Sequence, residues 1–364
     1  MTLMRLAHAV LASAFIAIAP ACNAGGHVNI YNWTDYIAES TLADFQKATG
    51  IQPAYDIFDA NEILEAKLLA GRSGYDVVVP SNHFLGRQIQ AGIFAPLDRS
   101  LLPNYSNLDP AILRHLQRND PGNIYAVPYL WGTSGIAYNK DMIKKVLGVD
   151  TIDSWSALFD PEIMKKLHQC GVAVMDSPDE VYGAAIHYLG GEADKIDQSD
   201  YEAATALLKS VRPYITYFHS SKFVSDLANG EICVAMANSG DGLQAISRAK
   251  EANNGLRIEY VVPKEGGNLW FDMLAIPADA KNKAEAHAFI NFMLDPVNIA
   301  KVTEHTGYAN PNDASKKFLP ASIVNDPVVY PPHKVLRRLY VSSPPPHQIE
   351  RLITRGWQGL KTGN

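Results

Sequence analysis

Short apolar runs alternate with helix-forming segments near the start of the chain, and this alternation constrains the fold more than any other feature. The strand-like runs occupy residues 28–31, 51–57 and 75–80. Each run is followed by a segment with apolar residues at helical spacing, and a glycine ends each of these segments. Strands that alternate with helices in this way form parallel sheets with helices on both faces. The sequence therefore predicts an α/β fold.

A second alternating block indicates a second lobe. The extended, glycine-punctuated stretch at residues 125–138 is where we expect the first crossing between lobes, and strand-like runs follow at 172–175 and 232–237. Residues 270–277 again have the composition of a core strand and predict a return crossing. A chain of 364 residues is long enough for roughly two domains. We expect lobe 1 to comprise residues 25–132 and 256–305, and lobe 2 to comprise residues 133–255 and 306–364.

The first 24 residues have the construction of a secretory signal peptide. Arg5 precedes an uncharged run, residues 6–21, which is too short to span a bilayer comfortably, and small residues follow it. The sequence therefore predicts export, with residues 1–24 removed. Cys22 raises the alternative of a lipid-anchored N-terminus, although the preceding residues 19–21 make a poor lipobox.

The charge and cysteine patterns argue against two kinds of partner. A net charge of −6 disfavours nucleic acid, which would need a basic face. If Cys22 leaves with the signal peptide, Cys170 and Cys233 remain, and an even pair in an oxidising compartment favours one disulfide. No Cys-x-x-Cys or His-x-x-x-His spacing accompanies them. We therefore expect neither a metal site nor a cofactor.

Four acidic residues lie at or beside predicted strand ends, in both prospective lobes. They are Asp35, Glu180, Asp241 and Asp272. Each has an ordinary local explanation, such as a helix cap or a first-turn acid that complements the helix dipole. Their joint placement is more informative, because ligands of α/β sheets collect beyond the carboxyl ends of strands. Several carboxylates in one cleft are costly without counter-cations, and a di- or polyvalent cation removes that cost.

Aromatic residues accompany the first of these acids. Trp33 and Tyr36 flank Asp35 where a strand gives way to a helix that we expect to begin near Ile37. Two aromatic faces around one carboxylate suit an organic cation. The alternative is a partly buried Trp and Tyr with Asp35 as a helix N-cap. Ser81 also follows a strand end, where capping is again the ordinary explanation.

Five segments, in order along the chain, carry a resemblance to one protein family. They are YNWTDYI (31–37), YDIFDANE (55–62), YDVVVPS (75–81), YFHSS (217–221) and VPKEG (262–266). Together they closely resemble the periplasmic polyamine-binding proteins, the putrescine- and spermidine-binding components of ABC importers. The resemblance covers essentially the whole mature chain. It implies a two-lobed class II periplasmic-binding fold, with a mixed, mostly parallel sheet flanked by helices in each lobe, that closes around its ligand.

The resemblance also implies which residues bind the ligand. The residues that match the family's aromatic box are Trp33, Tyr36 and Trp270, with Tyr308 bordering it. The residues that match its ammonium-binding acids are Asp35, Glu180, Asp241 and Asp272, and those that match its amine-orienting hydroxyl positions are Thr34 and Ser81. A disulfide of the family matches Cys170 and Cys233. Methylene chains lie against aromatic faces, and each ammonium needs up to three acceptors.

One position departs from the family pattern. The putrescine-binding members have an aromatic residue three positions before the acid of a Gly-Asp pair, where this chain has Asn238. The site loses a wall there, which admits a longer or differently headed ligand, and Asn238 can itself donate or accept a hydrogen bond. Trp270 stands where the family has Phe and partly refills the gap. We therefore expect a cationic amine, rather than putrescine specifically, with Asn238 in the binding site.

The leading hypothesis is a non-enzymatic, monomeric receptor of the periplasm. It would bind a polyamine in the interlobe cleft and deliver it to an inner-membrane ABC permease. Cadaverine or agmatine is an alternative ligand, and polyamine sensing is an alternative role. A competing hypothesis is an enzyme such as a glycosidase with paired carboxylates. However, no Gly-x-Ser-x-Gly motif is present, and a bound cation explains the excess of acids better than acid/base catalysis does.

Overall fold

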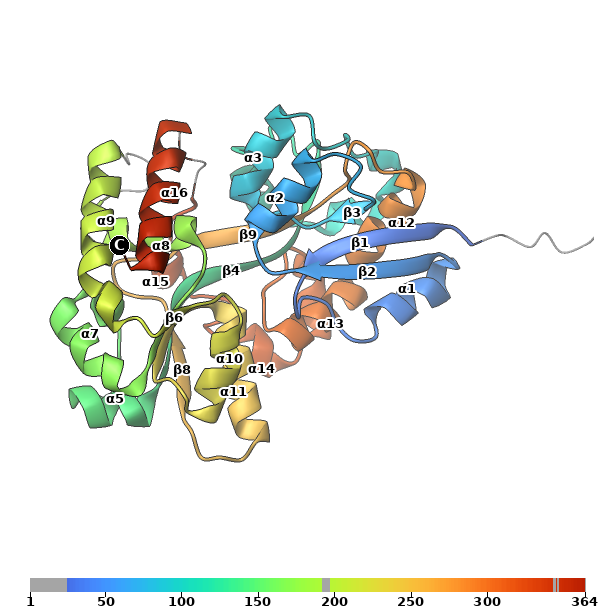
Figure 1. The fold of residues 1–364 in the computed structure, drawn as a ribbon. Coiled ribbons are helices and arrows are strands. Elements are labelled where there is room, and N and C mark those ends of the chain that lie inside the picture. Colours follow the sequence, from blue (N-terminus) through green and yellow to red (C-terminus); the bar gives the residue numbers. More distant parts are fainter. Residues whose placement is uncertain (1–24, 192–196, 343–344, 346, 364) are drawn as a thin grey trace, which may run out of the picture.

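Two lobes flank a pair of long strands in the computed structural model, which describes residues 25–191, 197–342, 345 and 347–363 (Figure 1). The expected signal peptide, with Cys22, lies outside these residues. One sheet runs through both lobes in the order β2-β1-β3-β9-β4-β7-β5-β6, with β8 beside β4. The predicted α/β fold with two lobes is therefore confirmed.

The first lobe is a sheet with buried residues on both faces. Its strands are β1 (His27–Trp33), β2 (Gln52–Phe58), β3 (Val77–Val78), β9 (Leu269–Ala275) and the first half of β4 (Ala126–Asn139). β1 is parallel to β2 and β3, whereas β9 is antiparallel to β3 and β4. Ile30 and Tyr31 are neighbours on β1 but belong to separate core clusters, as expected for a strand covered on both faces. The helices of this lobe are α1 (Thr41–Thr49), α2 (Asn61–Leu69), α3 (Asn82–Gln90), α4 (Pro110–Leu116), α12 (Lys283–Met293) and α13 (Pro296–Thr306).

The second lobe repeats this layered construction on the other half of β4. Its further strands are β5 (Val172–Val174), β6 (Tyr217–Phe218), β7 (Val234–Asn238) and β8 (Ile258–Val261). β7 and β8 are antiparallel to β4, whereas β5 is parallel to β6 and β7. Its helices are α5 (Lys140–Leu147), α6 (Ser156–Phe159), α7 (Pro161–Leu167), α8 (Pro178–Tyr188), α9 (Gln198–Val211), α10 (Lys222–Asn229), α11 (Ser239–Glu251) and α16 (His347–Thr362). Short helices α14 (Ala321–Val324) and α15 (His333–Leu336) lie in the connection before α16.

The predicted disulfide between Cys170 and Cys233 is confirmed. Cys170 precedes β5 and Cys233 precedes β7, and these two strands are hydrogen-bonded neighbours in the sheet. The bond joins positions 63 residues apart. It therefore ties together two strands between which the chain runs through α8, α9, β6 and α10.

The first crossing between lobes is a single strand. β4 pairs with β9 up to Thr133 and with β7 from Ser134 onward, which agrees with the crossing expected at residues 125–138. The expected lobe boundaries stay a prediction. β8 pairs with the second half of β4, and Ala309 forms a bridge with Trp131. We propose from these pairings that β8 belongs to the second lobe and the segment around Ala309 to the first.

Two expected elements differ in extent. The helix expected near Ile37 begins only at Thr41, and residues 34–40 form turns and irregular structure before it. Asp35 lies in the turn that follows β1 and has a left-handed backbone conformation with φ of 55°. The strand expected over residues 75–80 is reduced to Val77 and Val78. Pro80 has no N–H to donate to a sheet, and α3 begins two residues later. Residues that follow β1 and β3, among them Thr34 and Ser81, line a pocket.

Candidate functional site

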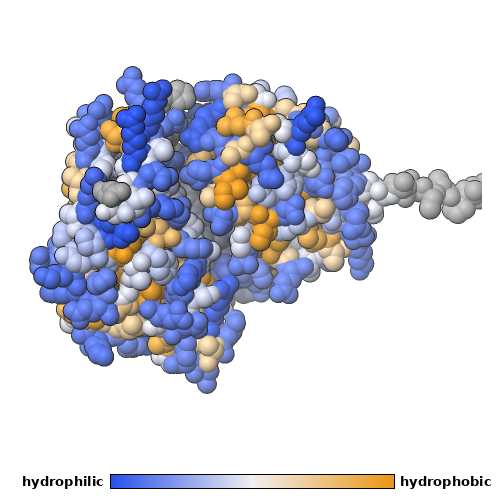
Figure 2. Space-filling view, viewed as in Figure 1, coloured by the Kyte–Doolittle hydropathy of each residue, from blue (hydrophilic) through white to orange (hydrophobic). Residues whose placement is uncertain are grey.

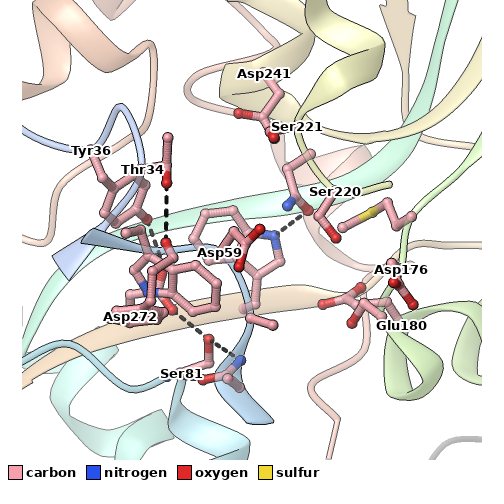
Figure 3. A pocket seen from close by; sticks show the side chains of 18 of the residues that line it. Thr34, Tyr36, Asp59, Ser81, Asp176, Glu180, Ser220, Ser221, Asp241 and Asp272 are labelled. Atoms are coloured by element: carbon pink, nitrogen blue, oxygen red, sulfur yellow. Dashed lines mark hydrogen bonds between the residues drawn. The ribbon is translucent and has the colours of Figure 1, made fainter. Parts of the chain in front are cut away.

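A pocket lies between the lobes, where strand ends of both lobes meet (Figures 2 and 3). Ten of the eleven predicted binding residues line it, and their role in binding stays a prediction. These ten are Trp33, Thr34, Tyr36, Ser81, Glu180, Asn238, Asp241, Trp270, Asp272 and Tyr308. The pocket thus brings together side chains that are more than 270 residues apart in sequence, some expected from strand ends and others from the family resemblance.

Asp35 is the exception, because it is not among the residues that line the pocket. Its side chain is 64% exposed and lies 3.6 Å from the Arg248 guanidinium of α11, in the opposite lobe. The alternative, Asp35 as a helix N-cap, is wrong, since Ser40 occupies the position before α1. A role of Asp35 in ligand binding stays a prediction. The left-handed backbone at Asp35 turns this side chain away from the direction that a continuing strand would give it.

Asp272 is the acid that the first lobe contributes to the pocket from β9. It lies on β9 and is only 5% exposed, and its two oxygens accept hydrogen bonds from the Tyr36 hydroxyl at 2.8 Å and the Ser81 hydroxyl at 2.6 Å. Ser81 holds the N-cap position of α3 but makes no capping bond with its side chain, so its hydroxyl serves Asp272 instead. Burial raises the pKa of Asp272 to about 7, although both donors favour the ionised form. The Thr34 hydroxyl is engaged differently, because it donates to the Phe58 carbonyl oxygen at 3.3 Å.

Aromatic rings form one side of the pocket. Tyr308 meets Tyr36 and Trp270 edge-to-face, with ring centroids 5.3 and 5.1 Å apart. Trp33 is held by its indole N–H, which donates to the Val79 carbonyl oxygen at 2.9 Å. The close approach of Tyr308 to α11 requires Gly240, since a Cβ there would lie 2.6 Å from the ring. These fixed faces can contact the methylene chain of a ligand or an ammonium group.

The second lobe supplies two carboxylates from the first turns of α8 and α11, the buried Glu180 and the partly buried Asp241. Glu180 accepts hydrogen bonds from the Ser134 hydroxyl at 2.6 Å and the Asn268 amide at 2.8 Å. Burial raises the pKa of Glu180. At Asp241, burial raises the pKa to about 7, while a hydrogen bond with Tyr308 opposes this shift. The carboxyl groups of Glu180 and Asp241 thus line the cleft. A cation beside them would favour their ionised forms.

The pocket has an excess of negative charge. Its carboxylates are Asp59, Glu62, Asp176, Glu180, Asp241 and Asp272, and no Lys or Arg is among the described residues that line it. Burial lowers the pKa of His83 to about 3, so this ring is neutral at ordinary pH. Asp176 has a partner outside the lining, the Lys361 ammonium at 2.6 Å. The other acids leave the cavity suited to a ligand that carries several positive charges.

Sequence analysis missed several residues that line the pocket. They are Phe58, Asp59, Ala60, Asn61, Glu62, His83, Met175, Asp176, Ser177, Ser220 and Ser221. Most of them directly follow β2, β5 or β6. The segments 55–62 and 217–221 carried the family resemblance, and the strand-end rule applied to them would have placed Asp59 and Ser220 in the site.

The structure resembles solved polyamine-transporter proteins. A putative spermidine/putrescine ABC transporter protein from Listeria monocytogenes is 34% identical, with a TM-score of 0.82 over 93% of this chain and 100% of its own. The spermidine/putrescine ABC transporter substrate-binding protein PotD from Streptococcus pneumoniae is 30% identical, with a TM-score of 0.76 over 93% and 99%. The two-lobed periplasmic-binding fold is thus shown by both comparisons.

Characterised relatives cover almost the same length. The chain is 50% identical to the putrescine-binding periplasmic protein SpuD of Pseudomonas aeruginosa, over 92% of both chains. It is 47% identical to the putrescine-binding periplasmic protein PotF of Escherichia coli, over 92% of this chain and 91% of PotF. These relatives are binding proteins rather than enzymes, which supports the expected non-enzymatic role.

Within the described residues, none of the helices combines the length and apolar character needed to span a membrane. A family model for bacterial extracellular solute-binding proteins matches residues 40–330, and the chain belongs to that family.

Proposed function

We propose that this protein is a periplasmic receptor that binds a polyamine between its lobes and passes it to an ABC permease. The observation that carries the proposal is the interlobe pocket, in which six carboxylates face aromatic rings and no Lys or Arg is among the described residues of the lining. The names of SpuD and PotF, which describe putrescine-binding periplasmic proteins, support the same ligand class.

The distribution of the acids favours an extended organic cation over a metal ion. Among the described residues, no three Asp, Glu, His or Cys side chains converge closely enough to hold a metal. Asp272 comes from β9 in the first lobe, whereas Glu180 and Asp241 come from separate helices of the second. Separated carboxylates match a ligand whose charges are separated by methylene groups. Binding from both lobes would also favour the closed form, which is the form that a permease can distinguish from the empty receptor.

The finer parts of the proposal concern location and state. We propose that residues 1–24 direct export and that the mature receptor acts as a monomer, without nucleic acid. The periplasmic relatives support the location. The alternative ligands, cadaverine and agmatine, and the alternative role in sensing are not favoured, because SpuD and PotF are named as putrescine-binding proteins.

Calorimetry with a polyamine panel tests the proposal directly. Protein stripped of co-purified ligand by unfolding and refolding is titrated with putrescine, cadaverine, spermidine, spermine and agmatine. We expect saturable binding of at least one of them with a dissociation constant of about 10 μM or tighter, since two buried charge pairs and an aromatic contact are formed. Absence of binding by the whole panel, from protein that is folded by circular dichroism, contradicts the proposal.

The variant Asp241→Asn is expected to weaken diamine binding by more than about tenfold, because an ammonium loses its charged partner. The change keeps the side chain nearly the same size, and it is measured by calorimetry at pH 8, where the wild-type carboxylate is ionised. Asp313→Asn is the matched control, since Asp313 is 61% exposed and does not line the pocket. An unchanged dissociation constant for Asp241→Asn would show that Asp241 only complements the dipole of α11.

A further inference from the structure

The amide of Asn238 has one orientation in this pocket. The Trp270 indole N–H donates to Asn238 Oδ1 at 3.0 Å. An indole nitrogen can only donate, so the amide atom that faces it must be the oxygen. Rotating the amide by half a turn would place its NH₂ group against the indole N–H, with two donors in contact. Trp270 therefore fixes which end of the Asn238 amide points toward it and which end points away.

The NH₂ end of the same amide is free to meet a ligand. Asn238 holds the N-cap position of α11 but makes no capping bond with its side chain, which lines the pocket instead. Among the described residues, no acceptor is hydrogen-bonded to Asn238 Nδ2, and this atom is not one of the fully buried, unpaired polar atoms. In this acidic pocket, Asn238 Nδ2 is an uncharged group that can only donate hydrogen bonds to the ligand.

This donor conflicts with a ligand made only of ammonium groups. Ammonium and guanidinium groups have donors and no acceptor, so either group beside Asn238 Nδ2 leaves the donors of both partners unpaired. A carbonyl oxygen would accept from Nδ2. A site built to bond a polar group rejects ligands that lack the matching group, because its own polar atoms are then left unpaired. Asp241 lies three residues further along the same helix and offers a carboxylate for a cationic nitrogen.

We propose that Asn238 and Trp270 select a cationic amine that carries a neutral hydrogen-bond acceptor, such as a diamine acylated on one nitrogen. The free ammonium would pair with a carboxylate of the cleft, and the acyl carbonyl oxygen would accept from Asn238 Nδ2. This inference rests on the proposed function, because it concerns the ligand of the same pocket. Asn238 is the specificity-determining residue, and Trp270 is the residue that positions it.

The test compares two ligands on each protein by calorimetry at pH 8. Putrescine has two ammonium groups, and N-acetylputrescine has one ammonium and one amide. The measured quantity is the ratio of the putrescine dissociation constant to the N-acetylputrescine dissociation constant. We expect this ratio to exceed about 3 in the wild type. A wild-type ratio below 1 overturns the proposal.

Two variants separate the donor from the residue that orients it. Asn238→Asp keeps the shape and still accepts from the Trp270 indole, but it presents a carboxylate oxygen to the ligand, so the ratio is expected to fall at least about tenfold. Trp270→Phe removes the indole N–H and lets the amide rotate, so the ratio is expected to fall at least about threefold. Asn253→Asp adds the same charge at an exposed turn beyond the other end of α11 and is expected to leave the ratio unchanged.

The outcomes distinguish this inference from the proposed function. If wild-type protein binds neither ligand nor any other polyamine, the proposed function fails first. If it binds polyamines but Asn238→Asp leaves the ratio at the wild-type value, the selective role of Asn238 is overturned while polyamine binding stands. If only Trp270→Phe has no effect, the positioning role of the indole is overturned. Thermal unfolding of each variant verifies that it is folded, and Asp is as good an N-cap residue as Asn.

Discussion

Polyamine affinity is expected to fall steeply below pH 7, by about tenfold per pH unit for each carboxyl group that must ionise to bind. Asp241 and Asp272 both have pKa values raised by burial to about 7 in the empty pocket. A bound ammonium needs the ionised form of these groups. Ligand ammonium groups resemble the Lys side chain, whose pKa is about 10.4, and therefore stay charged through this range. His83 does not oppose the trend, because its lowered pKa keeps it neutral.

The measurement is the dissociation constant from about pH 5.5 to pH 8, with calorimetry in buffers of different ionisation enthalpy near pH 7. Binding near pH 7 should release protons, because the ligand shifts both carboxyls toward ionisation. In Asp241→Asn one titrating group is gone, so the slope of log affinity against pH should be reduced. A dissociation constant that stays level from pH 5.5 to pH 8 contradicts the assignment of these acids as ammonium partners.

The empty protein should show the opposite dependence in its stability. A carboxyl whose pKa is higher in the folded state than in the unfolded state binds more protons when folded, so its contribution to stability decreases as pH rises from about 4 to 7. Bound polyamine should remove this loss, because it favours the ionised forms. The measurement is the free energy of unfolding at pH 5 and at pH 8, with and without ligand. Without ligand these carboxyls should contribute less stability at pH 8 than at pH 5, and with bound polyamine this decrease should be absent.

Removing the disulfide is expected to lower the free energy of unfolding by about 4 kcal/mol, because the unfolded chain gains the freedom of an uncrosslinked loop. The loop spans 63 residues, from Cys170 to Cys233, and it contains α8, α9 and α10. The variant Cys170→Ala/Cys233→Ala is compared with the wild type by urea unfolding monitored through tryptophan fluorescence. The reduced wild-type protein provides a second comparison with unchanged side chains.

Ligand affinity is the control for this experiment. Neither cysteine lines the pocket, so a folded double-alanine variant should bind ligand with a dissociation constant within about threefold of the wild type. A wild-type unfolding midpoint in the double variant would show that the disulfide does not restrict the unfolded chain. Loss of ligand binding without loss of stability would instead indicate that the disulfide holds α8, which carries Glu180, in its position at the pocket.

Sequence analysis predicted those lining residues that lie where an apolar run ends. Trp33 ends an apolar run and Asp241 follows one, and both line the cleft. Asp272 lies within β9 rather than at its end, so the structure corrects its expected place at a strand end. Asp59 and Ser220 obey the same rule and were missed because their segments were used only for the resemblance. Sequence alone therefore grouped Glu180, Asp241 and Asp272 correctly in one lining, whereas Asp35 lies outside it.

Other features depend on contacts that no local pattern contains. The left-handed backbone of Asp35 places its carboxylate beside Arg248 in the other lobe, outside the pocket lining. The Ser81 hydroxyl bonds Asp272, although the sequence equally allowed a helix cap. The donor role of Asn238 follows from an indole N–H that comes from β9, 32 residues away.

The sequence alone determined the α/β class, the cysteine pair and the collection of acids and aromatic rings at strand ends, because hydrophobic periodicity and residue chemistry are local properties. Only the tertiary structure decided which oxygen each donor satisfies, which end of the Asn238 amide is left for a ligand, and which acid lies outside the pocket. These depend on the approach of side chains from different lobes, and hydrogen-bond partners at about 3 Å are set by packing rather than by neighbours in the chain.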